Sequence, residues 1–132
     1  FSLDDKHLKR AGLDYWQELN ITYHRNLKSF LEYAKDGQLH IVSKFAHKTY
    51  SEVDYSDTND DHYFIFGKET TGLPEKFMRE NEDKCIRIPM DDTHIRSLNL
   101  SNTAAIIIYE ALRQQSFKGM DLVKHYETDK LD

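Results

Sequence analysis

Two glycines bracket a short polar segment at residues 66–75 (FGKETTGLPE). Gly67 directly follows an apolar run, and Gly72 closes the turn. Glycines at such a place let the backbone approach a ligand and aim its N–H groups at it. A bare G-x-x-x-x-G spacing also fits an ordinary strand–turn–helix connection. The segment is neither a phosphate-binding P-loop, which ends in Gly-Lys-Ser/Thr, nor a dinucleotide fingerprint, which needs G-x-G.

A second segment that could form a functional site spans residues 85–115 (CIRIPMDDTHIRSLNLSNTAAIIIYEALRQQ). It joins a short strand ended by Pro89, a polar loop over residues 90–98, and an apolar helix that Asn99 or Ser101 can cap. A strand end, a polar loop and a helix N-terminus together form ligand sites in open α/β sheets. A helix that is apolar on nearly every side is buried in a core or in a subunit interface.

The spacing of the histidines and the position of the single cysteine do not indicate metal or thiol chemistry. The seven histidines are scattered without H-E-x-x-H or another ligand spacing, so we expect no metal site. The single cysteine, Cys85, stands in an expected strand without a nearby histidine, and a small buried hydrophobe is the simpler interpretation.

The composition indicates one globular domain over residues 1–132, because 39% of the residues are hydrophobic and 12% are aromatic. One cysteine, no membrane-spanning run and no visible signal peptide together predict a cytoplasmic protein without membrane association. The net charge of −5 disfavours a general nucleic-acid binder, so an RNA substrate would need local basic patches. The basic cluster at residues 6–10 (KHLKR) is either such a contact or a solvated helix face.

Hydrophobic spacing places helices and strands in alternation. We expect helices at residues 1–15, 27–35, from 74 onward and at 101–115, and strands at 21–24, 39–43, 50–53, 63–66 and 86–88. Strands alternating with helices predict an α/β fold with a mainly parallel sheet flanked by helices. The tail from residue 119 to residue 132 is polar, and we expect it to fray.

The sequences of both segments resemble those of the SPOUT (SpoU–TrmD) RNA methyltransferases. The motif RAGLDYW at residues 10–16 is typical of the small tRNA wobble-nucleotide 2′-O-methyltransferases within that family. The resemblance covers residue 1 to about residue 119. It implies a SPOUT-type α/β knot, in which the C-terminal segment forms a trefoil knot that binds S-adenosylmethionine. Family members begin with a further strand and a helix that carries an arginine. Neither stands in this sequence, so we expect it to be truncated at the N-terminus.

The resemblance also implies the site residues. Main-chain groups of Val42, Gly67 and Ile88 would hold the cofactor, with Ser97 and Leu98 closing over its adenosine. The polar side chains facing the ribose to be methylated would be those of Glu69, Arg96, Ser97 and Asn102. Tyr109 shares the helix face of Asn102, and it is either a further catalytic residue or a tyrosine of the core or dimer interface.

The implied activity is S-adenosylmethionine-dependent tRNA (cytidine(34)-2′-O)-methylation, with S-adenosylhomocysteine as the second product and no metal. The family forms homodimers through the C-terminal helix, residues 101–115. Two alternatives stay open. One is a SPOUT enzyme acting on another tRNA or rRNA ribose, and the other is a cofactor-binding or RNA-binding module without activity.

Overall fold

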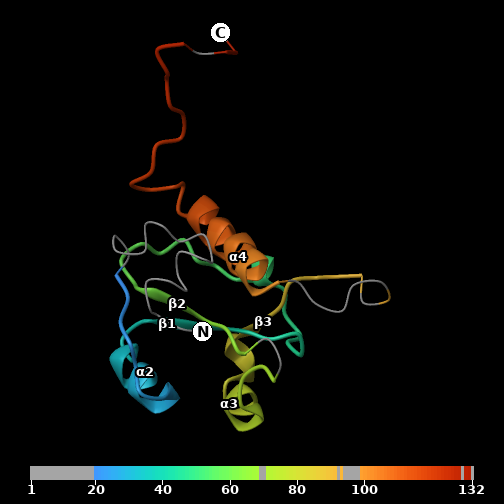
Figure 1. Ribbon diagram of the computed structural model, residues 1–132. Helices are drawn as coiled ribbons and strands as arrows, with labels where there is room; N and C mark the ends of the chain where they lie inside the picture. The colour runs from blue at the N-terminus through green and yellow to red at the C-terminus, as the bar shows by residue number, and fades with distance from the viewer. Residues whose placement is uncertain (1–19, 69–70, 92, 94–98, 129, 132) are drawn as a thin grey trace, which may run out of the picture. The chain divides into compact units, whose positions relative to one another are not determined.

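The structure is a computed structural model that describes residues 20–68, 71–91, 93, 99–128, 130 and 131 (Figure 1). The chain divides into two compact units, Phe1–Tyr33 and Ala34–Asp132. The described part of the first unit contains α2 (Leu27–Tyr33). The Asn26 side chain accepts a hydrogen bond from the Ser29 N–H at 2.9 Å, which confirms the predicted start of this helix.

Residues 21–24 form no strand, so this prediction is wrong. The His24 ring instead packs against two aromatic rings of α2, with centroids 5.4 Å from Phe30 and 5.0 Å from Tyr33. Apolar alternation over four residues cannot make a strand without a neighbour, and no described segment pairs with this one. The predicted helix at residues 1–15 lies outside the described residues.

The second unit is built on a three-stranded parallel sheet in the order β2-β1-β3. Its strands are β1 (Gln38–Val42), β2 (His62–Ile65) and β3 (Cys85–Ile86). Ile41, Ile65 and Ile86 are buried in its core. The chain enters β1 through Gly37, where a Cβ atom would lie 2.5 Å from the Tyr63 ring, so only glycine fits this approach. The predicted parallel α/β architecture is confirmed.

One face of the sheet is covered by α4 (Leu100–Gln114) and by the segment that precedes β2 (Figure 1). Tyr55 of that segment is fully buried, and its ring packs edge-on against His40 of β1 at a centroid distance of 4.9 Å. Gln114 of α4 accepts a hydrogen bond from the Tyr55 N–H at 2.7 Å. The helix is thereby tied to the sheet through a buried aromatic residue.

The opposite face carries α3 (Glu75–Glu80), followed by the 3-10 helix η3 (Glu82–Lys84). Phe77 is the buried residue of α3. The Cys85 thiol, at the start of β3, points to the carbonyls of Met78 and Asn81 at 3.8 and 3.5 Å. The sequence predicted Pro74 as the first helical residue, but Pro74 stands at the N-cap of α3, one position before the first helical residue, Glu75.

Residues 50–53 also differ from the prediction of a strand, because Tyr50–Glu52 form the 3-10 helix η2. Thr49 forms an isolated parallel bridge with Arg87, the residue after β3, and the Tyr50 N–H donates to the Arg87 carbonyl at 2.9 Å. The Tyr55 hydroxyl then donates to the Tyr50 carbonyl at 2.5 Å. This bond holds the chain in a turn where a strand would have to continue.

Asn99, and not Ser101, caps α4, since its side chain accepts a hydrogen bond from the Ser101 N–H at 2.7 Å. The loop before this cap includes residues 94–98, which lie outside the described part of the chain. The threading that would define a trefoil knot therefore stays a prediction. No helix in the described residues is long and apolar enough to cross a membrane.

Candidate functional site

The three residues predicted to hold a cofactor through their main chain lie at one edge of the sheet. Val42 ends β1, Gly67 follows β2 by two residues, and Ile88 follows β3 by two residues. Neighbouring parallel strands have their carboxyl ends at the same edge. We call this place, where the three loops leave the sheet, the carboxyl edge (Figure 1). The Ser43 N–H donates to the Ile86 carbonyl at 3.0 Å and joins two of the loops at their base.

The turn after β2 closes tightly over Gly67. A Cβ atom at Gly67 would lie 2.3 Å from the carbonyl carbon of Gly72 and 2.5 Å from the Leu73 nitrogen. Gly72 has a φ of 70°, and its N–H donates to the Lys68 carbonyl at 2.9 Å. Both glycines are therefore required by the backbone, one for space and one for its left-handed conformation.

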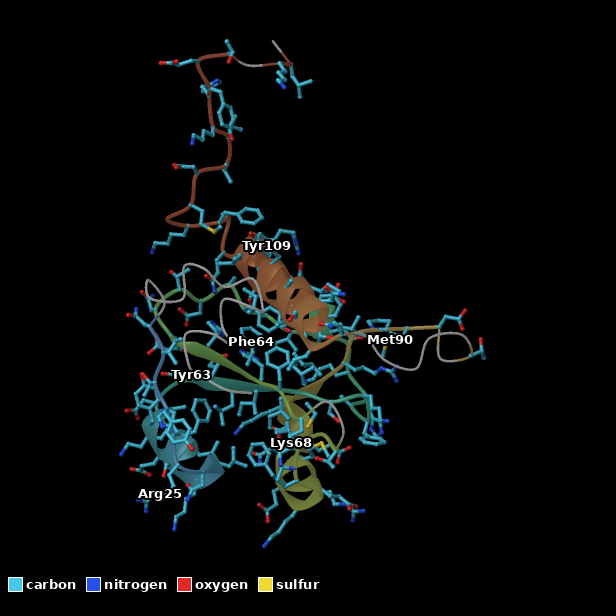
Figure 2. All side chains as sticks on the ribbon, in the orientation of Figure 1. Arg25, Tyr63, Phe64, Lys68, Met90 and Tyr109 are labelled. Carbon is cyan, nitrogen blue, oxygen red and sulfur yellow. The ribbon has the colours of Figure 1, made fainter. Side chains whose placement is uncertain are left out.

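Two predicted site residues lie on α4. Asn102 is exposed in the first turn, three residues after the cap. Tyr109 is 57% exposed and lies seven residues further on, which places it on the same helix face (Figure 2). The other four predicted side chains, those of Glu69, Arg96, Ser97 and Leu98, lie outside the described residues.

The titratable groups with the most altered pKa values lie under α4 and not at the carboxyl edge. His40 is 5% exposed, and burial lowers its pKa to about 4, with His62 and Lys48 adding to the effect. Burial also raises the pKa of the Tyr55 hydroxyl. Burial likewise raises the pKa of Cys85, which keeps it a thiol and argues against a nucleophile.

A chain of hydrogen bonds fixes the tautomers of the two histidines. His62 Nε2 lies 2.8 Å from the Asp57 carbonyl, which can only accept, so this nitrogen carries a hydrogen. His62 Nδ1 is then the acceptor of the bond from His40 Nε2, at 3.0 Å. Burial lowers the pKa of His40, so its ring is neutral in this arrangement.

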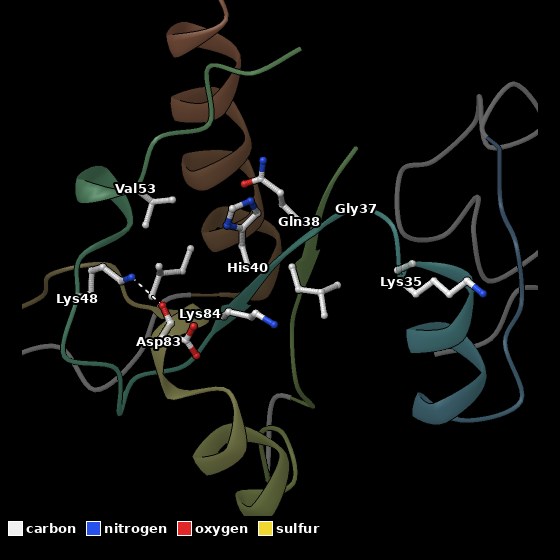
Figure 3. Close-up of a pocket in the computed structure, with 11 residues that line it drawn as sticks. Lys35, Gly37, Gln38, His40, Lys48, Val53, Asp83 and Lys84 are labelled. Carbon is white, nitrogen blue, oxygen red and sulfur yellow. Dashed lines mark hydrogen bonds between the residues drawn. The ribbon is translucent and has the colours of Figure 1, made fainter. Parts of the chain in front are cut away.

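A cavity of about 360 Å³ opens along β1 near the amino end of the sheet (Figure 3). Gln38 and His40 line it from β1, and Lys48 crosses it to donate to the Asp83 carbonyl at 2.8 Å. None of the described residues predicted for the site lines this cavity. Within the described part of the chain, no group of three or more His, Cys, Asp or Glu side chains could hold a metal ion.

The sequence interpretation missed two residues at the carboxyl edge. The turn after β1 exposes Phe45, which is 69% exposed, and the Lys44 ammonium lies 5.3 Å from the centroid of its ring. The sequence signal is an aromatic residue between basic ones in KFAHK (residues 44–48).

Comparison with known proteins places this geometry among RNA methyltransferases. The profile of the SpoU rRNA Methylase family matches residues 1–109. A Lactococcus lactis protein, provisionally named a tRNA (cytidine(34)-2′-O)-methyltransferase, is 64% identical over 132 residues, covering 99% of this chain and 78% of its own. A Saccharophagus degradans protein with that name, without the reservation, is 39% identical over 120 residues, covering 90% of this chain and 75% of its own.

Solved structures agree with the sequence matches. A Bacillus anthracis protein, provisionally described as an RNA methyltransferase, superposes with a TM-score of 0.85 at 56% identity, covering 92% of this chain and 76% of its own. A structure described as giving insight into 2-OH methylation of C/U34 on tRNA has a TM-score of 0.76 at 32% identity, covering 89% and 74%. An AdoMet-bound rRNA methyltransferase from Sinorhizobium meliloti has a TM-score of 0.57 at 27% identity, covering 67% and 33%.

Proposed function

Because the chain belongs to the SpoU rRNA Methylase family, we propose that it is an S-adenosylmethionine-dependent tRNA 2′-O-methyltransferase acting on the wobble nucleotide, position 34. The observation that carries this proposal is the 64% identity to the Lactococcus lactis protein over 132 residues. A related enzyme for rRNA is the second candidate, but the Sinorhizobium meliloti rRNA methyltransferase is 27% identical over 67% of this chain. A tRNA substrate is also the reason to expect a cytoplasmic enzyme.

The carboxyl edge fits a nucleoside cofactor. Backbone N–H and C=O groups can recognise an adenine edge, and a side chain at Gly67 would collide with the turn that closes over it. Val42, Gly67 and Ile88 would hold the cofactor through their main chain, while Ser97 and Leu98 would close over the adenosine. When bound, S-adenosylmethionine supplies an activated methyl group.

The polar residues of the chain act on the ribose. The 2′-hydroxyl has to be oriented in line with the methyl group and to lose its proton. Asn102, exposed at the start of α4, offers an amide for that orientation. Glu69, Arg96 and Ser97 complete the set facing the ribose, and Tyr109 extends it along the same face of α4.

The exposed apolar surface of α4 supports a homodimer. In the single chain only Ile107 and Ala111 of this helix are buried, whereas Ile106, Ile108 and Tyr109 are 38%, 41% and 57% exposed. An apolar helix face of this kind marks a surface for association, and a second copy offers the same face. The partner helix would also bring its own residues close to Asn102 and Tyr109.

The activity is tested with labelled S-adenosylmethionine and tRNA transcripts that carry either a ribose or a 2′-deoxyribose at position 34. We expect label only in the transcript with the ribose. Asn102→Ala should reduce turnover by about a hundredfold while the far-ultraviolet spectrum is unchanged. Asn59→Ala, an exposed asparagine outside the carboxyl edge, serves as the control. Equal labelling of the deoxy transcript would move the substrate to another nucleotide.

The dimer is tested by measuring the mass in solution of an Ile106→Lys variant. A buried lysine in each copy should turn a dimer into a monomer at micromolar concentration. Leu122→Lys is the matched control, because Leu122 is 74% exposed but follows α4. A wild-type monomer, or an Ile106→Lys dimer, would contradict this interface.

A further inference from the structure

We propose that Phe45 and Lys44 form a binding subsite for the substrate RNA, in which an unpaired base stacks on the Phe45 ring and Lys44 pairs with a phosphate. The inference rests on the proposed function and adds a part of the site that the predicted residues do not include. Phe45 lies three residues after Val42, in the first of the loops at the carboxyl edge. An RNA whose ribose reaches this edge would pass beside it.

The exposure of Phe45 is imposed by the turn. The Ala46 N–H donates to the Ser43 carbonyl at 3.2 Å, and the Phe45 N–H donates to Ser43 Oγ at 3.1 Å. Ser43 is itself bonded to β3 through the Ile86 carbonyl at 3.0 Å. Ala46 is buried at 8% exposure, whereas Phe45 is 69% exposed. The backbone therefore holds the aromatic ring outward on a fixed base.

The pair has the chemistry of a single-strand binding contact. Single exposed apolar residues are common on proteins and indicate little by themselves. An aromatic ring beside a cation is different at the edge of a site for RNA, because bases stack on aromatic rings and phosphates pair with cations. Nucleotides of an anticodon loop are unpaired, so their bases are available for such stacking.

The charges around the turn leave Lys44 available to a ligand. The chain carries a net charge of −5, so RNA must meet local positive charge. Of the nearby basic residues, His47 pairs with Glu82 at 3.3 Å, and Lys48 donates to the Asp83 carbonyl at 2.8 Å. Lys44 contacts the Phe45 ring, and no ion pair links it to any other described residue.

The experiment compares Phe45→Ala, Phe45→Trp and Lys44→Ala with the wild type in tRNA affinity by filter binding. Turnover, S-adenosylmethionine affinity and mass in solution are measured on the same samples. Phe45→Ala should weaken tRNA binding by about 5- to 100-fold, with cofactor affinity and mass unchanged, and Phe45→Trp should restore it. Lys44→Ala should reduce the slope of tRNA affinity against salt by about one ion.

A matched control exists in the same chain. Lys124 lies 5.1 Å from the ring centroid of Tyr126, which is 62% exposed, so this pair has the same chemistry after α4. Tyr126→Ala should leave tRNA affinity at the wild-type value. A Phe45→Ala variant with wild-type tRNA affinity would overturn the subsite, as would one that loses cofactor affinity or changes mass. Absence of wild-type turnover would instead count against the proposed function, while the binding comparison still decides the subsite.

Discussion

The carboxyl edge and the surface beneath α4 are formed by the same three strands but differ in what occupies them. At the carboxyl edge the described residues offer backbone groups at Val42, Gly67 and Ile88 and the exposed side chain of Phe45, and Asn102 is exposed in the first turn of α4. Beneath α4 the polar groups are paired with one another. His40 bonds to His62, and Tyr55 is bonded through its N–H to Gln114 and through its hydroxyl to the Tyr50 carbonyl.

This difference separates binding from stability. Buried polar groups stabilise a fold only when they are hydrogen-bonded, and the network beneath α4 meets this condition at the residues just named. Groups intended for a ligand must instead face outward until the ligand arrives. Substitutions at the carboxyl edge should therefore affect binding and turnover, whereas those beneath α4 should affect the free energy of unfolding.

The largest effect is expected at Gly67. Gly67→Ala brings a methyl group to 2.3 Å from the Gly72 carbonyl carbon, which is too close for any real contact, so the turn must move. A displacement of about 1 Å in the groups that position a substrate can lower the reaction rate roughly a hundredfold. We expect a loss of similar size in S-adenosylmethionine affinity, which calorimetry measures. The variant is compared at a temperature where its melting curve shows it to be folded.

Gly119→Asn is the control for this substitution. Gly119 also has a positive φ, 82°, but a Cβ there would meet nothing within 4 Å. Asparagine tolerates this conformation, so cofactor affinity should remain at the wild-type value. Cofactor binding by Gly67→Ala at wild-type strength would contradict this prediction, because cofactor affinity would then not depend on the backbone of the carboxyl edge.

The two regions also differed in how well the sequence predicted them. The three strands of the sheet followed from apolar runs and glycines, and the cap of α4 was narrowed to Asn99 or Ser101, all from local signals, although the strands expected at residues 21–24 and 50–53 did not form. The contact of Tyr55 with His40 joins residues far apart in the chain, and no local pattern encodes it. The 3-10 helix at Tyr50–Glu52 was missed for another reason, because the hydrogen bond from the Tyr55 hydroxyl to the Tyr50 carbonyl, five residues away, leaves no trace in the hydrophobic pattern. Phe45 was missed because an exposed aromatic residue gives no periodic signal.

A second effect is expected from acid, at His40. Its pKa is 6.5 in an unfolded chain and about 4 in the fold, so the unfolded state binds more protons between these values. Stability is then fully present above about pH 6.5 and falls as the pH is lowered towards 4. The free energy of unfolding falls by about 1.4 kcal/mol for each pH unit between the two pKa values, which amounts to a loss of at most about 3 kcal/mol. Urea unfolding at pH 7.5 and pH 5.0 measures it.

His40→Phe tests whether His40 causes this loss. Phenylalanine keeps an aromatic ring against Tyr55 and Phe64 but cannot take up a proton. The variant should be destabilised at pH 7.5, because the hydrogen bond with His62 is lost, and should lose less stability than the wild type on going to pH 5.0. An equal acid loss in both proteins would assign the pH dependence to other groups.

The smallest of the three effects is expected at Gln114, which fastens α4 to the segment preceding β2. Its side chain accepts from the Tyr55 N–H at 2.7 Å and donates to the Val53 carbonyl at 3.0 Å and to Glu110 at 2.9 Å. Gln114→Ala leaves the two backbone groups without this partner, which should lower the free energy of unfolding by about 2 kcal/mol. Urea unfolding at pH 7.5 measures the change.

Gln114→Ala is also assayed for turnover. Gln114 lies at the end of α4 opposite Asn102, so the folded variant should methylate tRNA with a wild-type KM for cofactor. Gln115→Ala is the matched control. The Gln115 side chain donates one hydrogen bond to the Tyr55 carbonyl at 2.9 Å, so its loss should lower the free energy of unfolding about half as much. A variant of full stability that loses turnover would mean that the position of α4, and not only its first turn, belongs to the site.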